Sequence, residues 1–165
     1  MEAKFVFPTK KSPKVFTLIV VVNRDGEVLL GMKKRGFGIG KWNGFGGKVE
    51  QGESIKNCAI RELQEECGLV ARSLHKHGIV WFDTEEEPST ISEVHLFTVD
   101  EYEGEISESD EMSPKWFAKN SLPFDCMWPS NSHWLPLVLD GKKFDAYFLY
   151  KNEREMIKYE VYEHK

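Results

Sequence analysis

Residues Gly47 to Leu69 read GKVEQGESIKNCAIRELQEECGL, and the spacing within this stretch decides the fold prediction. Glu53 follows Gly47 after five residues, and the run from Arg61 to Glu66 reads RELQEE. This run places three carboxylates close together, and hard divalent cations are bound in proteins by clustered carboxylate oxygens. The stretch therefore predicts a helix that presents a candidate metal site.

The predicted helix runs from Ile55 to Cys67. Ser54 before it is a favourable N-cap residue, and Gly68 after it can adopt the positive φ angle that ends many helices. At about 100° per residue, one stripe of the helix carries the carboxylates of Glu62, Glu65 and Glu66. A neighbouring stripe carries the side chains that should face the core: Ala59, Ile60, Leu63 and Cys67.

The acidic stripe by itself allows two interpretations. Like charges three or four residues apart cost only about 0.2–0.5 kcal/mol each on an exposed helix, so a solvated face is one of them. Gly47, Glu53 and Arg61 at their fixed spacing favour the other, a metal site. Oxygen ligands suit Mg²⁺, with Mn²⁺ as an alternative, and no His or Cys has the spacing of a zinc site. The predicted ligands are oxygens of Gly46, Glu62, Glu65 and Glu66.

Length and charge restrict the class of protein. A chain of 165 residues predicts one domain with a core of its own. The formal charge is −5, and no basic block of the nucleic-acid-binding type occurs. The longest apolar run, Leu18 to Val22, is too short to span a membrane. We therefore expect a monomer that reaches a small anionic substrate through a cation, with neither a nucleic-acid polymer nor a membrane as partner.

The cysteines and the first residues bear on the compartment. Cys58, Cys67 and Cys126 form no CxxC motif and are odd in number, which indicates a reducing intracellular compartment. We predict a cytoplasmic protein, with the mitochondrion or the nucleus as alternative compartments. Residues 1–14 contain no apolar segment of the secretory type, and we interpret them as a short basic extension before a single domain at 15–165.

The rest of the chain reads as strands and loops around two helices. A second helix is predicted from Asn131 to Leu139, although it contains Pro136. The predicted strands are Val15–Val22, Glu27–Lys33, Leu74–Asp83, Ser92–Asp100, Glu111–Ala118, Lys143–Tyr150 and Met156–Tyr162. This mixture predicts an α/β fold in which a mixed sheet packs between helices.

The pattern from Gly47 to Leu69 matches G-x5-E-x7-R-E-U-x-E-E-x-G-U, with U aliphatic, so the chain resembles the Nudix hydrolases. Four further segments resemble the mammalian MutT homologues within that family: GMKKRGFGIGKWNGFGGKV (31–49), ESDEM (108–112), PFDCMWP (123–129) and KKFDAYF (142–148). The resemblance implies a Nudix α/β/α sandwich. It also implies Mg²⁺-dependent hydrolysis of oxidised purine nucleoside triphosphates, such as 8-oxo-dGTP, which sanitises the nucleotide pool. The products would be a monophosphate and pyrophosphate, and Glu111 would join the metal ligands.

The same resemblance implies a nucleotide site. Phe37, Phe82 and Trp128 would form an apolar slot for a purine, in which stacking contributes about 1–3 kcal/mol per base. Asn43 can both donate to and accept from a base edge. Phe82 could equally be a core residue, and Lys33 a solvated strand residue. The other implied substrate-binding residues are Thr17, Lys33, Phe45, Gly46, Gly47, Lys48, Pro129, Ser130 and Asn131.

One departure from the family concerns base recognition. Ser130 and Asn131 stand where the mammalian homologues have two adjacent aspartates that read the base. Two carboxylates can share or exchange a proton, whereas Ser and Asn do not titrate near neutral pH. The substitution predicts a changed or narrower base preference. The acidic loop Glu85 to Glu87 is a second difference, which would reshape the rim of the pocket.

Two remaining residues of the motif have expected supporting roles. Arg61 is expected to orient a carboxylate through a bidentate hydrogen bond rather than to contact substrate, and Glu53 to support the loop before the helix. Two other functions stay open: a Nudix hydrolase of methylated purine nucleotides, and a catalytically silent nucleotide-binding module. The complete set of motif carboxylates argues against the silent module.

Overall fold

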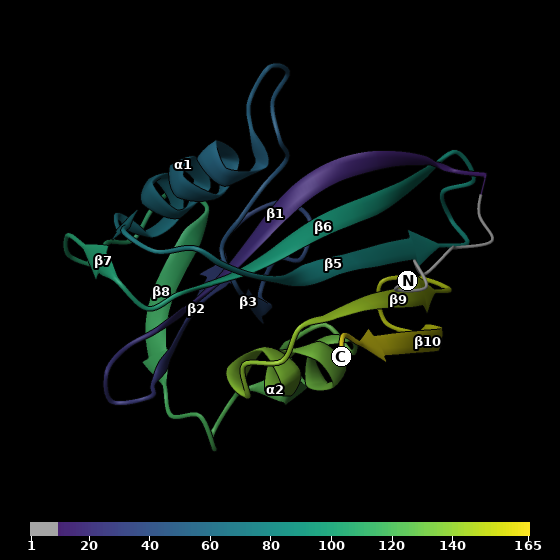
Figure 1. The fold of residues 1–165 in the computed structure, drawn as a ribbon. Helices are drawn as coiled ribbons and strands as arrows, with labels where there is room; N and C mark the ends of the chain where they lie inside the picture. Colours follow the sequence, from purple (N-terminus) through teal and green to yellow (C-terminus); the bar gives the residue numbers. More distant parts are fainter. Residues whose placement is uncertain (1–9) are drawn as a thin grey trace.

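A mixed β-sheet lies between two helices in the computed structural model, which describes residues 10–165 (Figure 1). Helix α1 spans Ile55–Cys67 and helix α2 spans Asn131–Leu139, both at the predicted bounds. The predicted α/β sandwich is thereby confirmed. In the described residues, no helix is long and apolar enough to cross a membrane.

The sheet contains most of the strands. They are β1 (Ser12–Val22), β2 (Val28–Lys33), β3 (Trp42–Asn43), β5 (His75–Thr84), β6 (Thr90–Val99), β8 (Met112–Phe117), β9 (Phe144–Tyr150) and β10 (Met156–Glu163). Their order is β10-β9-β5-β6-β1-β2-β3, and β8 pairs with β2. The pairs β1–β6 and β5–β9 are parallel and the others are antiparallel, so the sheet is mixed as expected. A second sheet pairs β4 (Val70–Ala71) with β7 (Tyr102–Glu103), and a short 3₁₀ helix covers Phe124–Cys126.

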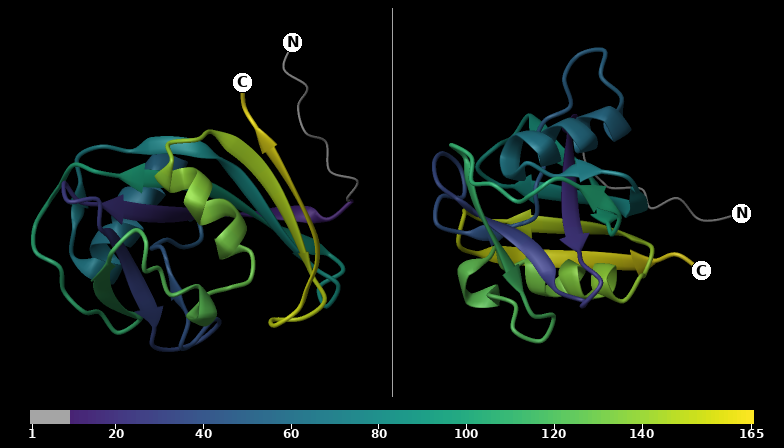
Figure 2. Two further views of the ribbon diagram at one scale, coloured as in Figure 1. Left: turned by 90° about the horizontal axis from the view of Figure 1, so that it is seen from below. Right: turned by 90° about the vertical axis from the view of Figure 1, so that its left-hand side faces the viewer.

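The two faces of β1 serve two separate hydrophobic clusters, because successive strand residues point in opposite directions. Ile19 and Val21 pack on the face covered by α1, whereas Val20 packs on the face covered by α2. Figure 2 shows the two helices on opposite sides of the sheet. From α1, the buried apolar side chains are Cys58, Ala59, Leu63 and Cys67; from α2 they are Trp134, Leu135 and Val138.

The ends of α1 have the predicted caps. The Asn57 amide donates to Ser54 Oγ at 3.1 Å, and Gly68 has φ 83°, a left-handed conformation that costs glycine little. The expectation for Ile60 is only partly met, because this side chain is half-buried and lies outside both clusters.

The first strand begins earlier than predicted. It starts at Ser12 rather than Val15, and Lys11 Nζ already contacts Asp83 Oδ1 at 2.5 Å. Residues 10–14 therefore belong to the domain, and the rest of the predicted basic extension lies outside the described residues. Three strands were not predicted, β3, β4 and β7, because two-residue strands leave no periodicity to read.

We predict that Leu63→Ala lowers the free energy of unfolding by about 2–5 kcal/mol, since Leu63 is fully buried between α1 and the sheet. Urea denaturation followed by circular dichroism measures this. Gln64→Ala, at the exposed neighbouring position, is the matched control and should change stability by less than about 0.5 kcal/mol. Equal effects of the two substitutions would contradict the placement of α1.

Candidate functional site

Arg61 organises the acidic stripe of α1. Its Nε donates to Glu53 Oε2 at 2.7 Å and its Nη2 to Glu53 Oε1 at 2.9 Å, which confirms the predicted bidentate pairing with a carboxylate. Its Nη1 donates to Glu62 at 2.9 Å and to Glu65 at 3.2 Å. One guanidinium therefore holds three carboxylates, because its fork of five N–H groups matches carboxylate geometry.

Glu53 ties the loop before α1 to the helix. Besides pairing with Arg61, its Oε1 accepts the Glu50 amide at 3.1 Å. The hydrogen bond from Arg61 lowers the pKa of Glu53 to about 2, so this carboxylate is ionised at every physiological pH. Glu53 thus has the supporting position that the sequence predicted.

Glu66 is the buried member of the stripe, with only 4 % of its surface exposed. The Gly46 amide donates to Glu66 Oε1 at 2.7 Å. The pKa of Glu66 is raised to about 8, mainly by burial, with smaller contributions from the nearby Glu62 and Glu111 carboxylates; the hydrogen bond from Gly46 opposes this rise. The ionised form of Glu66 is therefore disfavoured unless a cation lies close to it.

Gly46 reaches Glu66 because the loop passes very close to β1. A Cβ atom added at Gly46 would lie 1.8 Å from the Thr17 carbonyl oxygen, so no side chain fits there. The loop is held by backbone hydrogen bonds from Thr17 to Gly47 at 2.9 Å and from Ile19 to Phe45 at 2.6 Å. Only glycine permits this approach.

Glu111 faces the same region from the segment before β8. Its carboxylate lies 3.4 Å from Lys33 Nζ and 3.7 Å from Arg35 Nη2. It also acts electrostatically on Glu62, whose pKa is raised mainly by burial. The sequence had no signal of its own for Glu111, which entered only through the family resemblance.

The donor set fits a hard divalent cation. Three carboxylates, those of Glu62, Glu66 and Glu111, interact unfavourably with one another, and a cation placed among their oxygens would relieve that repulsion. As they stand, no three His, Cys, Asp or Glu side chains in residues 10–165 are grouped closely enough to hold an ion. Glu65 is directed to Arg61 instead.

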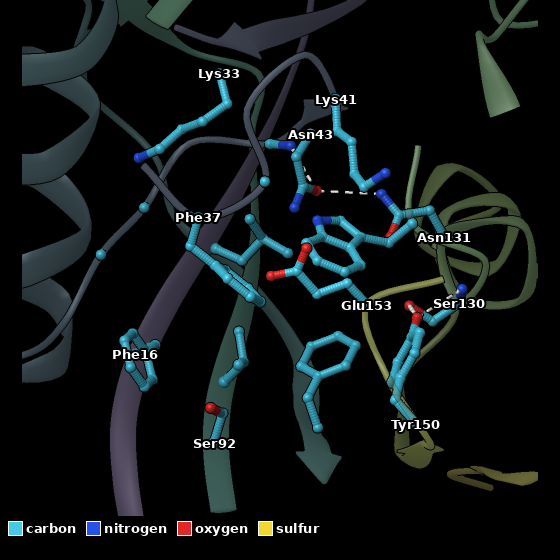
Figure 3. A pocket seen from close by; sticks show the side chains of 18 of the residues that line it. Phe16, Lys33, Phe37, Lys41, Asn43, Ser92, Ser130, Asn131, Tyr150 and Glu153 are labelled. Carbon is cyan, nitrogen blue, oxygen red and sulfur yellow. Dashed lines mark hydrogen bonds between the residues drawn. The ribbon is translucent and has the colours of Figure 1, made fainter. Parts of the chain in front are cut away.

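A cavity of about 670 Å³ extends from this acidic end along the sheet (Figure 3). Its size is typical of a pocket for a small ligand. The predicted substrate-binding residues that line it are Thr17, Lys33, Phe37, Asn43, Gly46, Gly47, Phe82, Trp128, Ser130 and Asn131. Glu86, from the acidic loop that was expected to reshape the rim, also lines it.

Three predicted substrate-binding residues do not line the cavity. The Phe45 side chain is fully buried in the cluster under α1, because alternation along the loop turns it away from the cavity. Lys48 is exposed, and its carbonyl accepts from Arg61 at 3.5 Å. Pro129 forms the turn before α2, where its carbonyl accepts from Ser132 Oγ at 3.1 Å. These placements correct the expectation that their side chains face the nucleotide.

The aromatic slot differs in detail from the prediction. Phe37 is 73 % exposed and stacks on Trp128, with 5.0 Å between ring centroids and 26° between planes. Phe82 stacks instead on Phe148 in the neighbouring strand, at 5.7 Å. One face of Trp128 is thus covered by a side chain from the glycine-rich loop, and a base that stacks there must displace Phe37.

Neutral hydrogen-bonding groups line the cavity beyond Trp128. Asn131 Nδ2 donates to Asn43 Oδ1 at 3.2 Å. Tyr150 donates its hydroxyl proton to Ser130 Oγ at 2.6 Å and accepts the Ser130 amide at 3.0 Å. Ser130 and Asn131 are almost completely buried, so both are held in fixed orientations.

Several cavity residues were not predicted: Lys41, Asp83, Thr84, Tyr150 and Glu153. The sequence offers only weak evidence that Asp83 lies at a site, because it is a single acidic residue that follows an apolar segment of its strand. Lys41 has its ammonium 5.2 Å from the centre of the Trp128 ring. Glu153 lies in a polar turn between two predicted strands, where nothing in the sequence distinguishes it from a solvated residue.

Comparisons with known proteins agree with this geometry. The sequence profile of the NUDIX domain matches residues 12–138. The chain is 49 % identical over 148 residues to an oxidized purine nucleoside triphosphate hydrolase of Danio rerio, covering 90 % of this chain and 94 % of that protein. The Mus musculus protein of the same name is 45 % identical over 150 residues, covering 91 % of this chain and 95 % of its own length. A crystal structure of a MutT protein from Bacillus halodurans superposes with a TM-score of 0.79 at 28 % identity, covering 90 % of this chain and 97 % of that one.

We predict that Glu53→Gln removes part of the acid sensitivity of folding. The pKa of Glu53 in the folded protein, about 2, lies below its ordinary value of 4.5. The pairing with Arg61 therefore stabilises the fold fully above pH 4.5, and this stabilisation is lost as the pH falls through 2. Urea midpoints of the variant should fall below those of the unaltered chain at pH 7, and the gap should shrink toward pH 2. Glu105→Gln, at an exposed position, serves as the control. A gap that does not change with pH would contradict the assignment.

Proposed function

The chain belongs to the NUDIX family, and from that premise we propose that it is a Mg²⁺-dependent hydrolase of oxidised purine nucleoside triphosphates such as 8-oxo-dGTP. The products would be the nucleoside monophosphate and pyrophosphate. The observation that carries this proposal is a cavity that has the buried carboxylate of Glu66 at one end and aromatic and amide side chains at the other. Such a cavity suits a molecule with a polyphosphate at one end and a base at the other.

The acidic end would bind the polyphosphate. Glu62, Glu66 and Glu111 would hold the divalent ion, with the loop at Gly46 beside them. Such an ion, when bound, neutralises phosphate oxygens and lowers the pKa of the attacking water. Arg61 would keep Glu62 oriented, and Lys33 has its ammonium in the cavity, where it can bind a phosphate oxygen.

The other end would bind the base. Trp128 and Phe37 offer π faces on which a purine can stack, and Asn43 and Asn131 offer fixed donor and acceptor groups. The related proteins from Danio rerio and Mus musculus carry the name of this activity and match nearly the whole chain, which supports the same substrate class. We propose that the protein acts as a monomer on cytoplasmic nucleotide pools.

We predict that Glu66→Gln lowers kcat by roughly 10²–10³-fold or more, because the amide cannot supply the negative charge that the cation needs. Pyrophosphate release from 8-oxo-dGTP with Mg²⁺ measures this. Near-normal unfolding of the variant by urea would show that the fold persists, and Gln64→Glu, at the exposed side of the same helix, is the control. Hydrolysis at the full rate in Glu66→Gln would overturn the catalytic assignment, and a chain that hydrolyses none of the purine triphosphates would favour the silent module.

We predict a narrower base preference than that of the mouse relative. The buried Ser130 and Asn131 hold one set of donors and acceptors and cannot change protonation near neutral pH. Steady-state kcat/KM values for 8-oxo-dGTP, 8-oxo-dATP, a methylated dGTP and dGTP, measured on both proteins side by side, decide this. Asn131→Asp should broaden the profile. Identical profiles for the two proteins would refute the prediction, and a maximum on the methylated nucleotide would favour the alternative substrate class.

A further inference from the structure

A carboxylate that neither the motif nor the metal site uses lines the base end of the cavity. Glu153 lies in the turn between β9 and β10, and Figure 3 shows its side chain directed into the cavity beside Phe37. Within residues 10–165, its carboxylate forms neither an ion pair nor a hydrogen bond. The one base-end cation of the cavity, Lys41, is placed against the Trp128 ring.

The turn holds Glu153 in place. Asn152 Oδ1 accepts the Arg154 amide at 2.9 Å and the Glu155 amide at 3.1 Å, and the Lys151 amide donates to the Glu155 carbonyl at 2.9 Å. An Asn side chain that bonds the backbone two and three residues on stabilises a tight turn. Glu153 therefore stands at the apex of a turn that the hairpin fixes over the cavity.

Asn43, which also lines the cavity, can supply a donor that complements this carboxylate. Its Oδ1 already accepts two hydrogen bonds, from the Gly44 amide at 2.9 Å and from Asn131 Nδ2 at 3.2 Å. The direction of the amide is thereby fixed, and Asn43 Nδ2 remains as a donor toward the cavity (Figure 3). The base end thus presents a fixed donor, Asn43 Nδ2, and an anionic acceptor without a partner, Glu153.

We infer that Glu153 is a specificity-determining residue that selects purines whose Watson–Crick edge carries two adjacent N–H donors, as in guanine-type bases. Its two oxygens accept from N1–H and the 2-amino group, while Asn43 Nδ2 donates to O6. On the same edge, an adenine-type base offers only its 6-amino group as a donor, and its unprotonated N1 directs a lone pair at the carboxylate. It therefore cannot form both hydrogen bonds with Glu153. This inference rests on the proposed function, because it assumes that the purine occupies this end of the cavity.

The first test compares substrates on matched variants. In Glu153→Gln, kcat/KM for 8-oxo-dGTP should fall about tenfold to a hundredfold, the cost of losing a charged hydrogen-bond acceptor. The decrease in kcat/KM for 8-oxo-dATP should be much smaller, so the ratio of kcat/KM for 8-oxo-dGTP to that for 8-oxo-dATP should fall by nearly the same factor. Glu155→Gln, in the same turn but outside the cavity, is the control and should keep that ratio. An equal fall for both substrates, or none, would overturn the inference.

The second test needs no turnover. Calorimetric binding of 8-oxo-dGMP and 8-oxo-dIMP without metal isolates the base contact, since 8-oxo-dIMP lacks the 2-amino group. In the unaltered chain 8-oxo-dGMP should bind about tenfold more tightly, and in Glu153→Gln this advantage should disappear. If the advantage disappears in Glu86→Gln instead, the carboxylate on the neighbouring loop between β5 and β6 reads the base and Glu153 does not. An absence of turnover together with the expected binding pattern would refute the proposed hydrolysis and leave the role of Glu153 standing.

Discussion

The close approach of the glycine loop to β1 is the constraint on which the site depends. Gly46 lies so near the Thr17 carbonyl that any side chain would collide with it. This contact brings the Gly46 amide to Glu66, and Gly46 and Glu66 both line the start of the cavity. A looser loop would leave Glu66 without its hydrogen bond and separate the acidic end from the base end.

Some carboxylates of the site are paired with a cationic side chain, whereas the buried Glu66 is not. Arg61 compensates Glu53 and also donates to Glu62 and Glu65. Glu66, beneath them, receives only a backbone amide. A buried carboxylate with a neutral partner and acidic neighbours favours the arrival of a cation. The same helix therefore supplies both a stable ion-pair network and a charge that only a ligand can satisfy.

The structure of residues 47–69 could be predicted from the sequence because it depends on residues that lie close together along the chain. Ser54 caps the helix, Gly68 ends it, and the pairing of Arg61 with a carboxylate follows from short-range spacing. The orientation of Phe45 could not be predicted, because the loop conformation turns its side chain into the core. The stacking of Phe37 on Trp128 likewise joins a loop after β2 to the segment before α2, and no pattern along the chain encodes that contact.

The sequence by itself determined the fold class, the acidic helix with its caps, and the family to which the chain belongs, since these depend on periodicity and on spacing within one short stretch. The resemblance assigned Asn43 and Asn131 to the nucleotide site, but only the tertiary structure decided how the base end of the cavity is assembled around them. Asn43, Asn131 and Tyr150 come from three distant segments, and Glu153 reaches the same space from a turn that the sequence marks only as polar. These residues come together because β9 pairs with β5 and α2 packs on the sheet. Such long-range packing cannot be predicted from patterns of neighbouring residues in the sequence.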